Sequence, residues 1–337
     1  MRKKNLITLF VLAVICSGAL CFAADKIDEE VTPRSRKIFI EPKKGMWESG
    51  KIKFLVAATL GYDNNAYLDS QRVGDAYTQQ FLKAAFLSPL SKKTDLELEY
   101  EFMNLLYADE EDLDLVRNGI RAGLEHKLNK DFTLSGGYNL DIIEYTNTGK
   151  DDYIENMFDF KIRQQMSKKM FQSLEYDIFY RSFSRRHTRD PLGAEMLDRE
   201  RNDLRNVFEY EIGRYFEKDL IKLTLEYFIN NSNEKYLDYY DYDSFKIGAS
   251  FMHLFSQKTT GYFSLSRQYR DYDHRTLIND TSAKQEDRTY LATVGLYYTF
   301  NRELSMGLSY TYRQNESNEP IDRYSGSLTS VSVYYRF

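Results

Sequence analysis

Charged side chains recur at every second position in several segments whose alternate residues are apolar. In segment 96–102, Glu97, Glu99 and Glu101 alternate with leucine, tyrosine and phenylalanine. A row of this kind can attract, pair or guide ions through its electrostatic field. It supplies no nucleophile with an adjacent base, which covalent catalysis requires. The spacing therefore predicts a charged surface that handles solutes without transforming them.

Histidine is the residue most able to support another chemistry, and the chain has few of them. His126, His187, His253 and His274 lie far apart and lack the spacing of metal ligands. Segment 271–274, Asp-Tyr-Asp-His, holds residue types that a hydrolase at a barrel rim could use, but it has no matched partner elsewhere. We therefore expect no enzyme activity, no cofactor and no metal site.

The segments that carry these charges are predicted to be strands, because apolar and polar residues alternate with a period of two. Segment 304–313 places Leu, Met, Leu, Tyr and Tyr on one face and Ser, Gly, Ser, Thr and Arg on the other. Segments 221–229 and 290–300 repeat this pattern. Their length of about ten residues suits a tilted strand that crosses a bilayer.

The connections between strands alternate in length. Short polar turns occur at 91–93, 129–131, 167–169, 217–219, 256–258 and 301–303. Longer polar connections occur at 63–75, 108–113, 146–152, 184–199, 230–242, 273–287 and 314–323. Membrane barrels have short turns at one rim and long loops at the other. This rhythm predicts fourteen strands, with twelve or sixteen as alternatives. A secreted soluble β-sandwich or solenoid is the competing fold.

The end of the sequence favours the membrane barrel. Val331, Val333, Tyr335 and Phe337 form the apolar face of a strand that ends on an aromatic residue. This pattern resembles the C-terminal signal of outer-membrane β-barrels of Gram-negative bacteria, which the barrel assembly machinery recognises. The resemblance implies an all-β fold, a closed antiparallel transmembrane β-barrel in the cell outer membrane. It covers residues 51–337. Because the short turns of such barrels are periplasmic, six short turns and seven long connections predict that both termini are periplasmic.

The start of the sequence indicates export. Residues 2–4 are basic and residues 6–22 are almost entirely apolar, which predicts a secretory signal peptide over residues 1–23. Cys16 and Cys21 are the two cysteines and lie within it, so the mature chain is expected to have no disulfide. Residues 24–50 are polar and are predicted to be a periplasmic leader, with a small plug in the lumen as the alternative.

Overall charge and hydropathy exclude two further classes. The formal net charge is −5, and removal of basic residues 2–4 makes it −8. This acidic balance argues against a nucleic-acid partner. No later segment approaches the roughly eighteen apolar residues of a transmembrane helix.

If the apolar faces point to lipid, the charged faces enclose the lumen. The predicted lumen-facing charges are Glu97, Glu99, Glu101, Arg117, Arg121, Lys161, Arg163, Glu175, Asp177, Arg205, Glu209, Glu211, Lys222 and Glu226. They indicate a porin-like transport channel for small hydrophilic solutes, and salt bridges between neighbouring strands are the alternative role for the same residues. The expected partners are outer-membrane lipid and lipopolysaccharide, and the barrel is expected to be monomeric.

A short motif supports a second function. Residues 61–65, Gly-Tyr-Asp-Asn-Asn, close the first predicted strand. They resemble a Gly-Tyr-Asp-x-Asn motif of barrels linked to polysaccharide export and of surface lipoprotein assembly modifiers. The resemblance implies an accessory barrel for export or surface assembly of a polysaccharide or lipoprotein. The sequence has no tetratricopeptide repeats, which those assembly modifiers carry.

Overall fold

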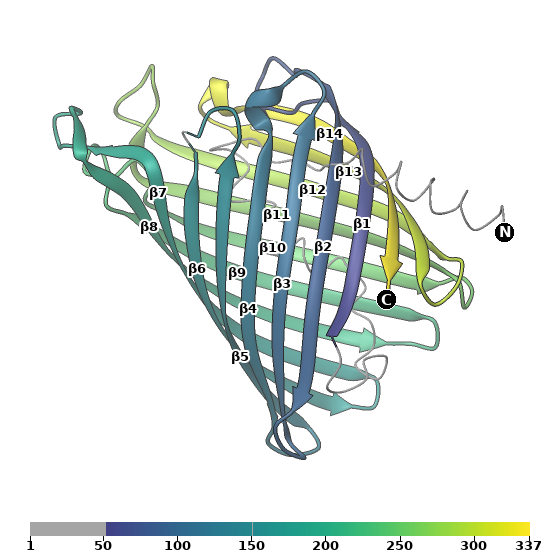
Figure 1. The fold of residues 1–337 in the computed structure, drawn as a ribbon. Helices are drawn as coiled ribbons and strands as arrows, with labels where there is room; N and C mark the ends of the chain where they lie inside the picture. Colours follow the sequence, from purple (N-terminus) through teal and green to yellow (C-terminus); the bar gives the residue numbers. More distant parts are fainter. Residues whose placement is uncertain (1–51, 150) are drawn as a thin grey trace.

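The computed structural model describes residues 52–149 and 151–337, which form one closed barrel of fourteen antiparallel strands (Figure 1). Each strand pairs with the next, and β14 pairs with β1. The strands are β1 (Ile52–Asp63), β2 (Asp75–Pro89), β3 (Thr94–Tyr107), β4 (Leu115–Lys127), β5 (Phe132–Tyr145), β6 (Tyr153–Ser167), β7 (Met170–Arg189), β8 (Glu195–Tyr215), β9 (Asp219–Ser232), β10 (Tyr242–Leu254), β11 (Thr259–Thr276), β12 (Lys284–Thr299), β13 (Leu304–Ser317) and β14 (Tyr324–Arg336). Two 3-10 turns, η3 (Glu111–Leu113) and η4 (Pro320–Asp322), lie in loops. The predicted fold and strand number are confirmed, whereas the predicted signal peptide and leader lie outside the described residues.

The outer surface of the barrel is apolar. Met306 and Leu308 on β13 are 38% and 50% exposed, although both are large hydrophobic residues. The intervening Ser305 and Gly307 are buried on the opposite face. Closure pairs the backbone polar groups between strands, so the barrel can sit in lipid without water to hydrogen-bond them. Within the described residues, no helix has the length and apolar composition of a membrane-spanning segment.

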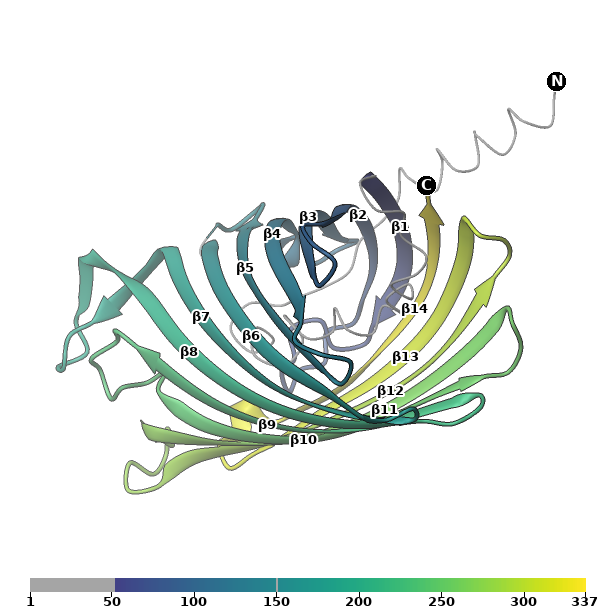
Figure 2. The same cartoon turned by 90° about the horizontal axis from the view of Figure 1, so that it is seen from below.

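The short turns use one recurring device at one rim of the barrel, called here the short-turn rim. Ser91 Oγ accepts hydrogen bonds from the backbone N–H groups of Lys93 (3.1 Å) and Thr94 (3.0 Å). Asn129, Ser256 and Asn301 cap their turns in the same way. Serine and asparagine favour turns because their side chains bond to nearby backbone. Both ends of the described chain lie at this rim (Figure 2).

Two predicted loops at the other rim, the long-loop rim, are largely strand. β7 continues to Arg189 and β8 begins at Glu195, so only residues 190–194 form the turn. Similarly, β11 extends to Thr276 and β12 begins at Lys284. The loop prediction for 184–199 and 273–287 was wrong because it took dense charge as a loop signal. A hairpin that extends past the bilayer has water on both faces and tolerates charge on both.

The seam between β1 and β14 is the shortest ladder of the described barrel. Nine residue pairs join these strands, and every other neighbouring pair of strands has at least twelve. The seam must also join the two ends of the sequence. Additional contacts at its long-loop end therefore matter for closure.

Those contacts come from the motif at residues 61–65. Asp63 Oδ1 accepts from the guanidinium of Arg313 on β13 at 2.6 Å, and both side chains are buried. The backbone N–H of Asn65 donates to the same oxygen, and Asn64 Oδ1 accepts from the Ser327 backbone N–H at 2.6 Å. We call Asp63, Asn64, Asn65 and Arg313 the seam clasp. Its contacts join β1 to β13 and β14 at the seam, and we expect them to stabilise the closed barrel.

Aromatic rings cover glycines on the inner face. Each ring lies on the residue directly opposite it across a strand pair, in four places: Tyr77 over Gly61, Phe171 over Gly213, Tyr262 over Gly295 and Tyr297 over Gly307. A Cβ atom at Gly295 would overlap the Tyr262 ring. Covering a strand glycine with an aromatic ring restores the packing that the glycine lacks.

Candidate functional site: the barrel lumen

The barrel encloses a cavity of about 1480 Å³. Every one of the fourteen strands contributes residues to its lining. Twelve of the predicted lumen-facing charges line it: Glu97, Glu99, Glu101, Arg117, Arg121, Lys161, Arg163, Glu175, Glu209, Glu211, Lys222 and Glu226. Asp177 and Arg205 are buried on the same faces of β7 and β8 as other predicted residues but do not line this cavity. Whether these charges select solutes stays a prediction.

Ion pairs join most of the charged side chains across strands. Lys83 Nζ lies 2.5 Å from Glu99 Oε1, and Lys161 Nζ lies 2.7 Å from Glu175 Oε2. Lys222 Nζ lies 2.5 Å from Glu211 Oε2. The wall therefore neutralises much of its own charge, as the salt-bridge alternative proposes. Each pair limits the cost of holding charge in a partly dehydrated wall.

A glycine on the inner face allows one ion pair to form between strands that are not neighbours. Arg121 on β4 lies opposite Glu99 on β3, yet its Nη1 lies 2.5 Å from Asp159 on β6. The intervening strand carries Gly137, where a Cβ would come within 2.7 Å of the Arg121 guanidinium. The missing side chain lets Arg121 reach across β5. Sequence reasoning considered only neighbouring strands and so missed this pair.

One cross-strand row concentrates negative charge. Lys161, Glu175, Glu209, Glu226 and Lys246 are successive register partners from β6 to β10. Lys161 pairs with Glu175 at 2.7 Å, and Lys246 lies 3.7 Å from Glu226. The row therefore holds three adjacent carboxylates between two ammonium groups, and the formal charge of these five residues is −1. We call these residues the carboxylate row.

On the wall formed by β1 and β12–β14, hydroxyl groups pair across neighbouring strands. Thr59 and Ser332 bond at 2.8 Å across the seam, and Ser309 bonds to Ser330 at 2.7 Å. Thr293 and Thr311 pair in the same way at 3.1 Å. Sequence reasoning looked for charges and missed this wall. The sequence feature that could have indicated it is the alternation of serine and threonine with apolar residues in the last strands.

At the long-loop rim, loop 233–241 packs onto other strands. Glu234 Oε1 accepts from the Arg189 backbone N–H at 3.1 Å. The Tyr239 ring lies 5.2 Å from the Arg189 guanidinium and 4.1 Å from that of Arg275 on β11. Arg275 in turn lies 3.0 Å from Asp322 of η4. These contacts connect loops that start from different hairpins.

Asp241, the last residue of this loop, lies where burial and neighbouring carboxylates disfavour a negative charge. Burial raises the pKa of its carboxyl to about 6, and repulsion from Asp238 and Asp273 adds to the increase. The Ser232 backbone N–H, which donates to it at 2.6 Å, opposes the shift. The packed loop therefore favours the protonated form.

We expect the loop to open more readily at neutral pH. Because its folded pKa exceeds the ordinary value of 3.8, Asp241 favours the packed loop fully below about pH 4, and this contribution is lost as pH rises through about 6. Amides of residues 233–241 should therefore exchange with deuterium faster at about pH 7.5 than at about pH 5 once intrinsic rates are corrected for. Asp241→Asn should weaken this pH dependence of the exchange rates, whereas Asp198→Asn, at an exposed position, should leave it unchanged. If the parent protein and both variants showed the same pH dependence, Asp241 would not control the opening of the loop.

The predicted rim histidine lies in solvent. The His274 side chain is 65% exposed, with Nδ1 3.1 Å from Asp238 Oδ2. No group of three or more histidine, cysteine or acidic residues in the described part of the chain could hold a metal ion. The charged lumen is therefore the stronger candidate for a functional site.

Comparisons with known proteins agree with this architecture. No protein-family model matches the sequence, and no curated protein matches it. A loop L8 deletion mutant of OmpT, an outer membrane protein of Vibrio cholerae, superimposes with a TM-score of 0.51 and 9% identity, covering 86% of this chain and 100% of that one. The outer membrane channel DcaP of Acinetobacter baumannii gives 0.50 and 9%, covering 85% and 96%. The fold is that of the outer-membrane β-barrels. The apolar exterior agrees with a barrel surrounded by lipid.

Proposed function

We propose that this barrel is a channel for small hydrophilic solutes. The observation that carries the proposal is the cavity of about 1480 Å³, to whose lining every strand contributes polar side chains. Charged and hydroxyl groups favour water and hydrophilic solutes over apolar ones, because burying them without partners is costly. A fourteen-stranded barrel is also wider than the eight-stranded barrels whose interiors side chains fill. The likeness in fold to the channel DcaP supports the proposal.

Planar-bilayer recording tests this function. Purified protein that migrates as a folded barrel is added to a membrane between salt solutions, and stepwise increases in current are expected. Heat-denatured protein is the control. A folded preparation that carries no current over a wide range of voltages would remove the proposal.

The carboxylate row should set a weak preference for cations. Glu209→Lys changes the charge of the row from one negative to one positive, because it replaces a carboxylate with an ammonium. We expect the cation-to-anion permeability ratio to fall only about threefold, because water and mobile ions in the lumen screen the charge of a wall residue. The measurement is the reversal potential in a potassium chloride gradient. Glu195→Lys, on the exposed part of the β7–β8 hairpin, is the matched control, and equal reversal potentials in the two variants would contradict the role of the row.

We also propose that Val331, Val333, Tyr335 and Phe337 act as the assembly signal. The Phe337 ring stacks on Phe54 with 5.2 Å between centroids, and its backbone N–H donates to the Phe54 carbonyl at 3.1 Å. Deleting Phe337 should reduce the amount of folded barrel in the membrane several-fold while leaving the conductance of each remaining channel unchanged. Quantitative immunoblots of membranes measure this, with Phe300→Ala as a control aromatic at the same rim. A normal amount of the deletion variant would argue against the signal.

A further inference from the structure

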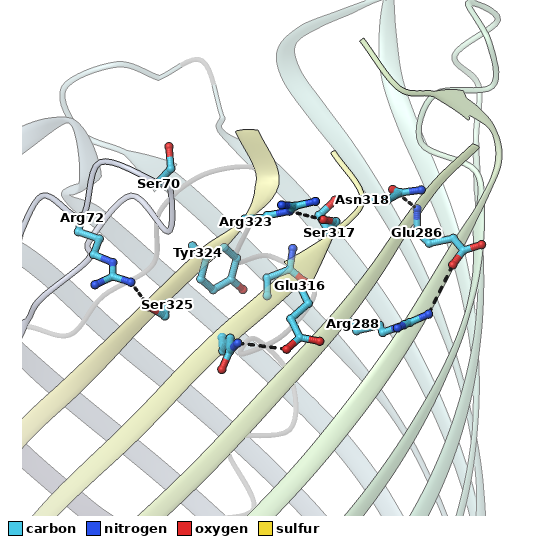
Figure 3. A pocket seen from close by; sticks show the side chains of 12 residues that line it. Ser70, Arg72, Glu286, Arg288, Glu316, Ser317, Asn318, Arg323, Tyr324 and Ser325 are labelled. Carbon is cyan, nitrogen blue, oxygen red and sulfur yellow. Dashed lines mark hydrogen bonds and ion pairs between the residues drawn. The ribbon is translucent and has the colours of Figure 1, made fainter. Parts of the chain in front are cut away.

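A groove opens on the outer surface of the barrel at the long-loop rim. Its volume is about 560 Å³, and it lies over the ends of β12, β13 and β14 beside the β1–β2 loop (Figure 3). Its lining is polar and charged: Ser70, Arg72, Glu286, Arg288, Gln314, Asn315, Glu316, Ser317, Asn318, Arg323, Tyr324 and Ser325. The groove is separate from the lumen, because the outward side chains of β12 and β13 form its floor.

The outward side chains of β13 place the groove relative to lipid. They run from Leu308 through Tyr310 and Tyr312 to Gln314 and Glu316, so an apolar surface gives way to tyrosines and then to polar groups. The Tyr312 hydroxyl donates to Gln314 Oε1 at 3.1 Å, towards the groove. Tyrosine girdles mark the boundary between acyl chains and headgroups. The groove therefore lies at the depth of lipid headgroups.

Three arginines surround the groove. Figure 3 shows Arg72, Arg288 and Arg323 around its opening. Within residues 52–149 and 151–337, the ion pairs give Arg288 one carboxylate, Glu286 at 3.9 Å, and give Arg72 and Arg323 none. Arg72 Nη2 instead donates to Ser325 Oγ at 2.6 Å, and Arg323 Nε donates to the Ser317 carbonyl at 2.6 Å. All three arginines are exposed, so their remaining donors can reach a ligand in the groove.

The β1–β2 loop holds Arg72 in place. Asp69 Oδ1 accepts from the backbone N–H groups of Gln71 (2.8 Å) and Arg72 (3.2 Å). Asn65 of the seam clasp donates through Nδ2 to the carbonyls of Asp69 (2.8 Å) and Ser325 (3.1 Å). Arg72 itself has a φ of 58°, a conformation that residues other than glycine rarely adopt. The loop is thus fixed to β14, with its arginine at the groove.

We propose that this groove binds the phosphorylated sugar headgroup of a glycolipid in the surrounding leaflet. Guanidinium groups match phosphate oxygens with forked, charge-assisted hydrogen bonds. Glu316 and Asn318 supply oxygens that accept hydrogen bonds from sugar hydroxyls, which a bare phosphate lacks. The depth of the groove favours a ligand anchored in lipid over one from solution. The site does not depend on whether the lumen conducts.

The probe is fluorescently labelled lipid A, titrated into phosphatidylcholine nanodiscs that contain the purified barrel, with chelator present to exclude bridging by divalent ions. We expect the triple variant Arg72→Gln, Arg288→Gln, Arg323→Gln to bind about tenfold more weakly, because it removes three charged donors. A second triple variant, Arg185→Gln, Arg199→Gln, Lys235→Gln, removes as many exposed positive charges elsewhere on the same rim. It should bind as the parent protein does.

A lipid headgroup site and a site for free phosphate give different results in this titration. Dephosphorylated lipid A should bind the parent protein at least about tenfold more weakly. Equal affinity of the two triple variants would overturn the proposal, and so would displacement of lipid A by inorganic phosphate at millimolar concentration. Resistance of the folded band to sodium dodecyl sulfate checks that each variant is a barrel. If the groove variant does not fold, Arg323→Gln alone should weaken binding about twofold to threefold, and no change would overturn the site.

Discussion

Replacing Arg313 with methionine should lower the free energy of unfolding by about 3–5 kcal/mol, because it removes one partner of a buried ion pair with Asp63. The two groups lie 2.6 Å apart, and their side chains are 4% and 0% exposed. The loss falls on the shortest ladder of the barrel, where nine residue pairs join β1 to β14. Unfolding in urea from lipid vesicles, followed by circular dichroism, measures the change.

The pair needs a double-mutant comparison to separate ion pairing from packing. Asp63→Asn together with Arg313→Met should recover part of the loss, because no buried charge then remains uncompensated. Arg288→Met is the control, since Arg288 carries its charge on the exposed outer face. If Arg313→Met costs no more than this control, the seam clasp does not stabilise the barrel.

Gly295→Ala should destabilise the barrel by about 1–3 kcal/mol, because the added methyl group overpacks the inner face where the Tyr262 ring lies. That ring also stacks on Tyr297, with 5.7 Å between centroids, so its movement disturbs a second aromatic–glycine pair. The same urea titration gives the change in free energy of unfolding.

Gly248 provides a matched control on the inner face of β10. A Cβ atom there would meet no heavy atom closer than 3.7 Å, which is ordinary contact. Gly248→Ala should therefore be neutral or stabilise the barrel by up to about 1 kcal/mol. Tyr262→Ala combined with Gly295→Ala should cost less than the two single changes together. A Gly295→Ala protein as stable as Gly248→Ala would refute ring-over-glycine packing at this position.

The alternation of apolar and polar residues within each strand was sufficient to predict the barrel, because one face of a strand meets lipid and the other meets the lumen. The short turns were predicted correctly for a related reason: Ser91 or Asn129 both marks and caps its own turn. The extended β7–β8 hairpin was not predicted, since outside a bilayer both strand faces meet water and the alternation disappears. The alternation therefore predicts the membrane-spanning part of a strand but not its extension beyond the bilayer.

The ion-pair partner of a charged side chain was harder to predict than the face of the strand on which it lies. Twelve of the predicted charges line the cavity, but Arg121 meets Asp159 across a strand because Gly137 has no side chain. Asp63 and Arg313 are 250 residues apart and meet only when the cylinder closes. Such contacts depend on register and closure, which no single segment encodes. The hydroxyl wall was missed because serine and threonine alone do not distinguish a lumen from any other polar surface.

The ion-paired wall has a consequence for electrical behaviour in dilute electrolyte. A pore with a large uncompensated wall charge retains mobile counterions, so its current stops falling when the bath is diluted. Here ammonium groups such as those of Lys83 and Lys161 already neutralise nearby carboxylates. Apart from the single excess charge of the carboxylate row, this pore would hold no such ionic reservoir. Its current would follow the bulk conductivity, and molecular size would govern passage more than the sign of the charge.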